Sequence, residues 1–434
     1  MELALQALID SATTPPLEGR LRIGMAVYGD ITHDSRVRRE AETLAASGHR
    51  VLLACLPGAG PSGWSPDGVD VLPLFPGRGG ALPASSGPFS GANRPRRRLA
   101  PVDRVAWLVG YLRNLDIWGG QAVAAIGEAD AWHVHDLPAL VAISAHVRAG
   151  TPIVYDSHEL FPDTGIAARL PRALRSLVRL EERRRVRRID TLITVNRELA
   201  DVLIQRYRPQ RTVVVHNCPG RASPWDGPDL LRHATGIPPN TPIVLYHGLL
   251  AGHRGLDVLT DALLEPGLEH AHLVLLGYGE LRDAMRDLSR TPRFAGRLHV
   301  LDAVPPEEVL NWISSADVGT SLLPGTDMNE RLATPNKLFE CLAAGVPVVV
   351  SDLPAVRRVV DDPAGSLGMI CDPTRSASVA LAIRSILELK PAERLALRNR
   401  CLAAARDRWN WETEVQGLIE TYERIAAKRP RPAA

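Results

Sequence analysis

Residues 333–350 read ATPNKLFECLAAGVPVVV, a helical pattern followed directly by a β-branched strand. Thr334 can cap the helix, Pro335 suits its first position, and Gly345 ends it after about three turns. Val346–Val350 is apolar on both faces, as is typical of a strand buried between two helical layers. A helix that leads into a buried strand is the repeating unit of a parallel α/β sheet.

The same alternation continues through most of the chain. Helix-period segments include Ser35–Ala46, Arg254–Leu264, Pro306–Ser315 and Asn336–Ala344. Two series of apolar runs between such segments predict an α/β protein with two doubly wound, Rossmann-like domains. The expected strands are Leu21–Val27, Arg50–Cys55, Val69–Leu74, Ala131–Val134, Pro152–Tyr155, Thr191–Val195 and Thr212–Val215, then Ile243–His247, His272–Leu276, Leu298–Leu301, Val318–Leu322, Val346–Val350 and Gly368–Cys371.

Proline and glycine mark the expected domain boundary. Residues 217–239 interrupt every periodic pattern. Residues 77–101 are rich in Gly, Pro, Ser and Arg and too long for an ordinary connection, which predicts a functional loop or disorder. The predicted divisions are an N-terminal extension (1–20), a first domain (21–217), a second domain (218–408) and a C-terminal helix (409–434).

Composition excludes several classes of protein. The 51 basic and 49 acidic residues give a net charge of +2, which argues against a nucleic-acid partner. Only Lys337, Lys390 and Lys428 are lysines, and none forms a P-loop or a kinase β3 motif. The five cysteines include no Cys-x-x-Cys pair, so no zinc site or disulfide framework is indicated. Residues 1–19 lack the pattern of a secretory signal, and no apolar run approaches 18 residues, so a cytoplasmic location is expected.

Polar side chains follow the strands of the first series, where open α/β sheets bind ligands. Gly29 allows a ligand to approach the backbone closely, and Asp34 or Ser35 can cap the next helix. His133-Val-His-Asp136 ends the fourth strand and Asp156-Ser-His-Glu159 the fifth. Strand alternation places His133 and His135 on one face. A metal site made by His135, Asp136, His158 and Glu159 is the rival interpretation, although no His-x-x-x-His spacing supports it.

The second series carries groups that suit a phosphorylated ligand. Arg254 at a glycine-flanked helix start is placed for a phosphate oxygen, or is a surface arginine. Lys337 and Glu340 share one helix face, where lysine can meet a diphosphate and glutamate a ribose. The alternative is a surface salt bridge, but 48 of 51 basic residues are arginine, which favours a specific role for Lys337. Gly277-Tyr-Gly279 is half a dinucleotide motif, broken by Arg282.

With these motifs the chain resembles the family 4 retaining glycosyltransferases of the GT-B fold, from about Leu21 to Ala427. Trp409-Asn-Trp-Glu412 and the helix after it are similar to the crossover helix that returns to the first domain in that family. The resemblance depends on the order and spacing of Asp34–Glu40, His133–Asp136, Tyr155–Leu160, His247-Gly248 with Arg254–Leu256, Gly277–Glu280 and Pro335–Glu340.

The resemblance implies transfer of a sugar from a nucleoside-diphosphate donor, with UDP or GDP expected, to an acceptor hydroxyl, with retention of configuration. It implies an N-terminal acceptor domain, a C-terminal donor domain and no further cofactor. The absence of any Asp-x-Asp pair favours a metal-independent reaction with no metal ligands. The implied site residues are catalytic (His135, Arg254, Lys337), donor-binding (Gly29, Gly248, Gly277, Gly279, Val304, Pro335, Asn336, Glu340) and, as acceptor-side candidates, Asp34, Arg36, His158 and Glu159.

Two residues depart from the family pattern. Leu332 stands where the first glutamate of a two-glutamate motif is expected, and Leu249 stands where a basic residue is expected. The alternatives are therefore a nucleotide-sugar epimerase of the same fold, a non-catalytic GT-B partner protein and, on the broken glycine motif, an NAD oxidoreductase.

The acceptor expected from the resemblance is a glycan, a glycolipid or a small molecule. Residues 169–188 form a densely basic helix that could contact anionic lipid at the inner face of the membrane. A solvated arginine-rich face is the alternative. Arg94–Arg98 offers a second possible contact with phosphate or membrane.

Overall fold

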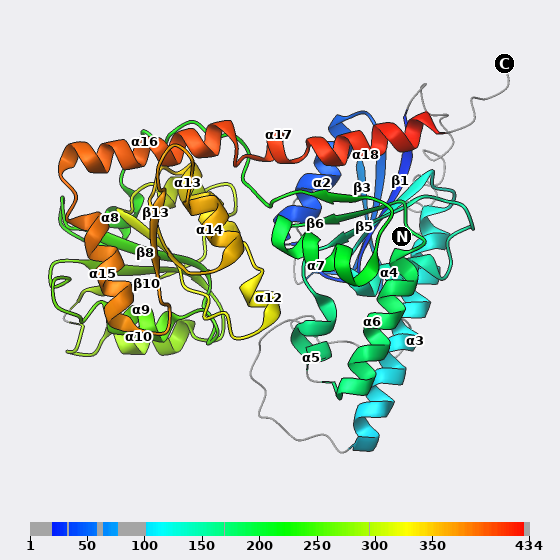
Figure 1. Cartoon of the computed structure of the whole chain (residues 1–434), viewed down its shortest axis with the longest axis horizontal. Helices are drawn as coiled ribbons and strands as arrows, with labels where there is room; N and C mark the ends of the chain where they lie inside the picture. The colour runs from blue at the N-terminus through cyan, green and yellow to red at the C-terminus, as the bar shows by residue number, and fades with distance from the viewer. Residues whose placement is uncertain are drawn as a thin grey trace.

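The protein contains two parallel β-sheets, each covered by helices (Figure 1). The computed structural model describes residues 20–32, 34–58, 64–76, 101–168, 170–294 and 296–428. The first sheet has seven strands in the order β3-β2-β1-β4-β5-β6-β7. Its strands are β1 (Arg22–Val27), β2 (Arg50–Cys55), β3 (Val69–Pro73), β4 (Ala131–His135), β5 (Ile153–Ser157), β6 (Thr191–Thr194) and β7 (Thr212–Val214).

The second sheet has six strands in the order β10-β9-β8-β11-β12-β13. The doubly wound α/β prediction is confirmed, and each predicted strand is present with its ends within two residues of the expected ones. Its strands are β8 (Ile243–Leu249), β9 (His272–Tyr278), β10 (Leu298–Asp302), β11 (Val318–Ser321), β12 (Val348–Ser351) and β13 (Gly368–Cys371).

Helices connect the parallel strands. Among the described residues, none of these helices is both long enough and apolar enough to cross a bilayer. They are α2 (Ser35–Ala46), α3 (Pro101–Ile126), α4 (Asp136–Ser144), η1 (Phe161–Asp163), α5 (Gly165–Ala168), α6 (Arg172–Val186), α7 (Arg197–Tyr207), α8 (Leu230–Thr235), α9 (Leu256–Ala262), α10 (Arg282–Ser289), α11 (Val309–Ile313), α12 (Met328–Arg331), α13 (Asn336–Ala343), α14 (Pro354–Val360), α15 (Ser376–Leu387), α16 (Pro391–Asp407), α17 (Trp411–Glu414) and α18 (Gln416–Ala427).

Three helix starts differ from the prediction. The helix expected over Pro306–Ser315 begins at Val309 and ends at Ile313. The helix expected from Arg254 begins at Leu256, because Gly255 before it has a left-handed φ of 69°. Pro335, not Thr334, is the N-cap of α13, and the Thr334 hydroxyl instead accepts a hydrogen bond from Asn196 Nδ2 at 2.8 Å.

Parts of three other predictions fall on residues that the structure does not describe. These are most of the N-terminal extension (1–19), the irregular loop with its arginines (77–100) and the end of the C-terminal segment (429–434). Arg169 also lies outside the described residues, and the basic helix begins at Arg172.

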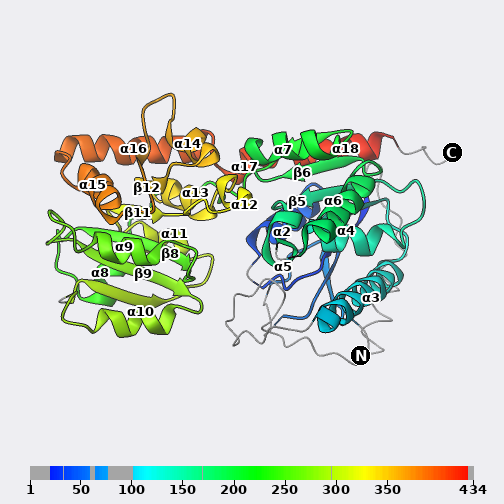
Figure 2. The same cartoon turned by 60° about the horizontal axis from the view of Figure 1, so that its bottom comes forward.

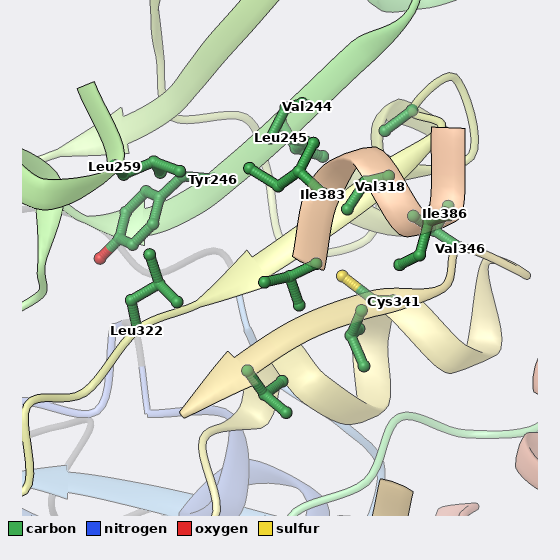
Figure 3. Close-up of a cluster of buried hydrophobic side chains, with 14 of the residues drawn as sticks. Val244, Leu245, Tyr246, Leu259, Val318, Leu322, Cys341, Val346, Ile383 and Ile386 are labelled. Carbon is green, nitrogen blue, oxygen red and sulfur yellow. The ribbon is translucent and has the colours of Figure 1, made fainter. Parts of the chain in front are cut away.

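A close contact fixes α13 on the second sheet. A Cβ added to Gly319 of β11 would lie 2.4 Å from Cys341 Sγ, so only glycine lets the helix approach this strand. Val318 points to the other face, beside Ile383 and Ile386 of α15 (Figure 3). This packing places the N-terminus of α13 at the carboxyl edge of the sheet.

The last helix returns to the first sheet. Figure 1 shows α16 along the second domain and α18 along the first, joined by α17. Trp411, Leu418 and Tyr422 belong to the same buried apolar cluster as Ile23 and Met25 of β1. The carboxyl-terminal residues therefore complete one face of the first domain.

Candidate functional site

A buried arginine organises the carboxyl edge of the first sheet. Arg36, 3% exposed, donates from Nε and Nη2 to the two oxygens of Asp156 at 2.7 and 2.9 Å, and from Nη1 to the Val215 carbonyl at 2.6 Å. Its Nη2 also lies 3.1 Å from Glu40 Oε1. Burial alone would raise the pKa of Asp156, but Arg36 and His158 hold that pKa well below its ordinary value. Asp156 is thus a fixed anion.

Two histidines that contact Oδ2 of Asp156 have opposite charge states. Burial would lower the pKa of His158, but Asp136 and Asp156 raise it to about 10, so this ring is protonated at neutral pH. Burial lowers the pKa of His135 to about 4, so that ring is neutral. His135 Nδ1 lies 3.2 Å from His158 Nε2. The Nε2 atom of His135 is buried and has no hydrogen-bond partner among the described residues, so its hydrogen-bonding capacity is unused within the protein.

His133, which is also buried, contacts Glu40 of α2 and Tyr422 of α18. His133 Nε2 lies 2.9 Å from Glu40 Oε2, and its Nδ1 lies 3.0 Å from the Tyr422 hydroxyl. The rings of His133 and His135 stack with centroids 4.7 Å apart, which confirms that they share a face. Sequence reasoning did not single out Glu40 or Tyr422 as site residues, because their partners are far away in the chain.

Four residues of this buried cluster carry atoms that could bind a metal ion. Glu40, His133, His135 and Asp156 place ligand atoms within 4.8 Å of one another. The Arg36 guanidinium and the protonated His158 already balance the charge of the two carboxylates, so an added cation would lie against fixed positive charge. These residues therefore do not fit a metal ion. This cluster is not the metal site considered from the sequence, which included Asp136, His158 and Glu159. In the structure His158 pairs with Asp136, and Glu159 accepts a hydrogen bond from Asn329.

Acceptor-side candidates divide into two groups. Asp34 is the N-cap of α2 and accepts from two backbone amides, and Arg36 is fully engaged inside the domain. The structure thus gives Asp34 and Arg36 positioning roles, and their contact with an acceptor stays a prediction. His158 is 20% exposed, and burial raises the pKa of Glu159 to about 7. These two side chains remain candidates.

Contacts join this edge to the second domain. Asn329 Nδ2 donates to Glu159 Oε2 at 3.3 Å, and its Oδ1 accepts from the Leu160 amide at 3.1 Å. Asn196 Nδ2 donates to the Leu332 carbonyl at 2.6 Å. The Leu332 side chain packs against the apolar cluster of the first domain. Leu332, where the family pattern has glutamate, is therefore an interdomain contact.

Cationic groups gather at the start of α13 in the second domain. Lys337 Nζ lies 3.5 Å from the centre of the Tyr246 ring, within cation–π range. Burial, with the like charge of Arg254, lowers the pKa of Lys337 to about 7. The Nε atom of Arg254 is buried with no hydrogen-bond partner in the described part of the chain. An anion beside Lys337 and Arg254 would relieve their mutual repulsion.

Glu340 lies one turn deeper on the same helix. Its Oε2 is 2.8 Å from His247 Nε2, and its side chain is 25% exposed. Burial would raise the pKa of Glu340, but His247, Arg39 and Lys337 bring it below its ordinary value. Arg39 belongs to α2 of the first domain, so this carboxylate feels charge from both domains. The local sequence offers no signal that pairs Arg39 with Glu340.

Backbone packing requires glycine at two of the predicted donor-binding positions but not at Gly29. A Cβ on Gly277 would lie 1.9 Å from the Gly248 carbonyl, and one on Gly279 would lie 2.5 Å from the Leu250 carbonyl. Close backbone packing thus accounts for these two glycines without a ligand. A Cβ on Gly29 would meet only Val27, at 3.7 Å, so protein packing does not require glycine there. Val304 lies half-buried in the loop after β10.

Comparisons with known proteins agree for both halves of the chain. Residues 33–218 match a family described as "Glycosyl transferase 4-like domain", and residues 241–389 match "Glycosyl transferases group 1". Together these matches span most of the chain.

Several named relatives are enzymes. The chain is 26% identical to glycogen synthase of Mycobacterium tuberculosis, over 91% of this chain and 90% of that protein. It is 30% identical to D-inositol 3-phosphate glycosyltransferase of Xylanimonas cellulosilytica, over 46% of each, and 32% identical to phosphatidyl-myo-inositol mannosyltransferase of M. tuberculosis, over 44% of this chain and 49% of that one. The match thus spans about half the length of these two relatives.

Solved structures share the fold. Sucrose-phosphate synthase of Thermosynechococcus elongatus superposes with a TM-score of 0.69 at 18% identity, over 94% of this chain and 100% of that chain. Anabaena HepE in complex with UDP and glucose superposes with a TM-score of 0.65 at 17% identity, over 92% and 99%.

Proposed function

We propose that this chain, which belongs to the GT-B glycosyltransferases, moves a sugar from a nucleoside-diphosphate donor to an acceptor hydroxyl with retention of configuration and without a metal ion. The observation that carries the proposal is the group at the start of α13: Lys337 beside Arg254, with Glu340 one turn deeper. A diphosphate there neutralises the two cations, and Glu340 accepts hydrogen bonds from ribose hydroxyls. The complex of HepE with UDP supports this donor class.

Lys337 and Arg254 are proposed to stabilise the negative charge that forms on the leaving diphosphate. Breaking the bond between the anomeric carbon and the diphosphate places negative charge on the departing phosphate oxygen. Lys337, Arg254 and the backbone amides that open α13, at Asn336 after the cap residue Pro335, stabilise that charge as it forms. This stabilisation would take the place of a metal ion.

Retention is proposed from the resemblance to the retaining family, and the way the first-domain carboxylates are held argues only against a covalent glycosyl-enzyme route to it. A protein nucleophile would need a free carboxylate near the anomeric carbon. Asp156 and Glu40, which lie within 4.8 Å of His135, are both held by Arg36, so neither is free to attack. We propose that the acceptor hydroxyl attacks from the face that the diphosphate leaves and passes its proton to the departing phosphate oxygen as the bond between that oxygen and the anomeric carbon breaks. We also propose that His135 Nε2 contacts the reacting sugar.

The donor is tested first by thermal shift with UDP, GDP and ADP, followed by transfer assays with the corresponding labelled sugars. We expect UDP or GDP to raise the melting temperature, and labelled sugar to move to a second molecule. Proton NMR of the product reports the anomeric configuration, and EDTA should leave the rate unchanged. Label that never leaves the nucleotide would refute transfer.

A further inference from the structure

The first domain has an apolar groove that the proposed chemistry does not use. It lies between α3 and α6 with α4 as its floor, and Figure 2 shows α4 between the other two helices. Its volume is about 540 Å³, within the range of about 300–1,000 Å³ typical of small-molecule sites. The groove is therefore large enough for a specific ligand.

Leucines on the two facing helices remain exposed to water. Leu112 of α3 is 50% exposed, and Leu174 and Leu177 of α6 are 36% and 59% exposed; all three line the groove. A contiguous exposed apolar surface of this kind usually marks a binding site.

The polar groups of the groove are satisfied within the domain. Asp116 Oδ1 lies 3.0 Å from His146 Nε2, and Glu181 Oε1 lies 2.7 Å from Arg185 Nη2. A peptide would bring backbone donors and acceptors that need partners, and these paired side chains offer few. A hydrocarbon chain needs none, so the lining favours a lipid over a peptide.

One end of the groove adjoins the acceptor side of the site. Leu137 and Pro138, which line it, directly follow Asp136 at the end of β4. Phe161 and Ala167 belong to the connection that follows Glu159 at the end of β5. A ligand in the groove would thus lie next to the carboxyl edge of the sheet.

Positive charge lies beside one of the exposed leucines. Arg172 and Arg175 stand in the first turn of α6, on either side of Leu174, and neither has an acidic partner within the described ranges. Guanidinium groups pair readily with phosphate and carboxylate. The arginines therefore complement an anionic head group.

We propose that the α3–α6 groove binds the hydrocarbon chain of an amphipathic acceptor whose anionic head group pairs with Arg172 and Arg175. That this ligand is the acceptor rests on the proposed function. Binding of the hydrocarbon chain in the groove can be tested without any sugar transfer.

Dodecyl phosphate below its micelle concentration is the probe, with inorganic phosphate and dodecyl maltoside as comparisons, in titration calorimetry on the full chain. We expect dodecyl phosphate to bind and inorganic phosphate not to bind. Leu177→Glu should weaken dodecyl phosphate binding at least tenfold. Leu381→Glu, 63% exposed on α15 of the other domain, is the matched control and should bind like the wild type. Equal affinity of Leu177→Glu and wild type would overturn the proposal.

The head group is tested separately with the double variant Arg172→Glu, Arg175→Glu. Its affinity for dodecyl phosphate should fall at least fivefold, while its affinity for dodecyl maltoside stays the same. An equal loss for both probes would refute a role of these arginines in charge recognition.

Two further measurements separate this inference from the proposed function. Nucleotide thermal shifts and donor hydrolysis should be the same in Leu177→Glu and wild type. Absent nucleotide binding together with intact dodecyl phosphate binding would refute the transferase and leave the groove assigned. A wild-type dimer that Leu177→Glu dissociates, with no binding of dodecyl phosphate, would assign the groove to a second copy of the chain and overturn the lipid proposal.

Discussion

The hydroxyl of Tyr422 lies 3.0 Å from Nδ1 of His133, although 289 residues separate them. Both side chains are fully buried, and the stacked ring of His135 is next to His133. Helix α18 thus helps to fix strand β4, which carries His135, the histidine proposed to contact the reacting sugar.

Tyr422→Phe removes this hydrogen bond and little else. Because His133 Nδ1 then lies buried without its partner, we expect the free energy of unfolding to fall by about 1–3 kcal/mol. Urea denaturation followed by circular dichroism measures the change. An unchanged midpoint and slope would show that Nδ1 gains another partner or that the bond contributes nothing.

Glu340→Ala tests the donor contact. Loss of a hydrogen bond to a charged group costs about 1.5–3 kcal/mol, so we expect nucleotide affinity to fall roughly 10- to 150-fold in titration calorimetry. Glu388→Ala, an exposed glutamate in the same domain, is the control and should leave affinity unaltered. Wild-type affinity in Glu340→Ala would refute the ribose assignment.

Lys337 makes donor binding depend on pH. Burial lowers the pKa of Lys337 to about 7, from an ordinary value of 10.5. Between about pH 7 and 10.5 the Lys337 amine therefore binds fewer protons in the folded protein than in the unfolded chain. The contribution of this group to stability therefore increases as pH rises through that window, and the full cost of burying the charge is present below pH 7. A bound diphosphate favours the ammonium form, so we expect binding to take up a proton at pH 8.

Calorimetry in two buffers of different ionisation enthalpy measures that uptake. Lys337→Arg, whose guanidinium stays charged, should abolish it, whereas Lys390→Arg at an exposed site should not. Equal proton uptake by wild type and Lys337→Arg would exclude Lys337 as the titrating group.

Gly29→Ala tests whether a ligand needs the space beside this loop. The added methyl would meet only Val27 at 3.7 Å, so the melting temperature should not fall. Turnover should fall at least tenfold if donor or acceptor approaches the Gly29 backbone. Gly110→Ala, where nothing lies within 4 Å, should keep both properties. Full activity in Gly29→Ala would remove this loop from the site.

Local patterns predicted the strands and the region around α13. Runs such as Val346–Val350 are buried on both faces, and only a covered parallel strand accommodates such a run. Contacts between distant residues left no such pattern. Arg36 looked available to an acceptor, because the sequence does not show that Asp156 and Val215 surround it.

Leu332 illustrates the same limit. In the sequence it is a missing glutamate, whereas in the structure its side chain joins the apolar cluster of the other domain. Its carbonyl accepts a hydrogen bond from Asn196 of that domain. From the motif alone, Leu332 could not be recognised as a residue that contacts the first domain.

The packing of α17 and α18 on the first sheet has a consequence for biosynthesis. Trp411, Leu418 and Tyr422 cover β1, yet the ribosome makes them after the whole second domain. At about 5–20 residues per second, that delay is on the order of 10–40 s. Throughout it, the nascent first domain exposes the apolar face that these side chains will cover, and this is the interval in which a chaperone would have a surface to hold.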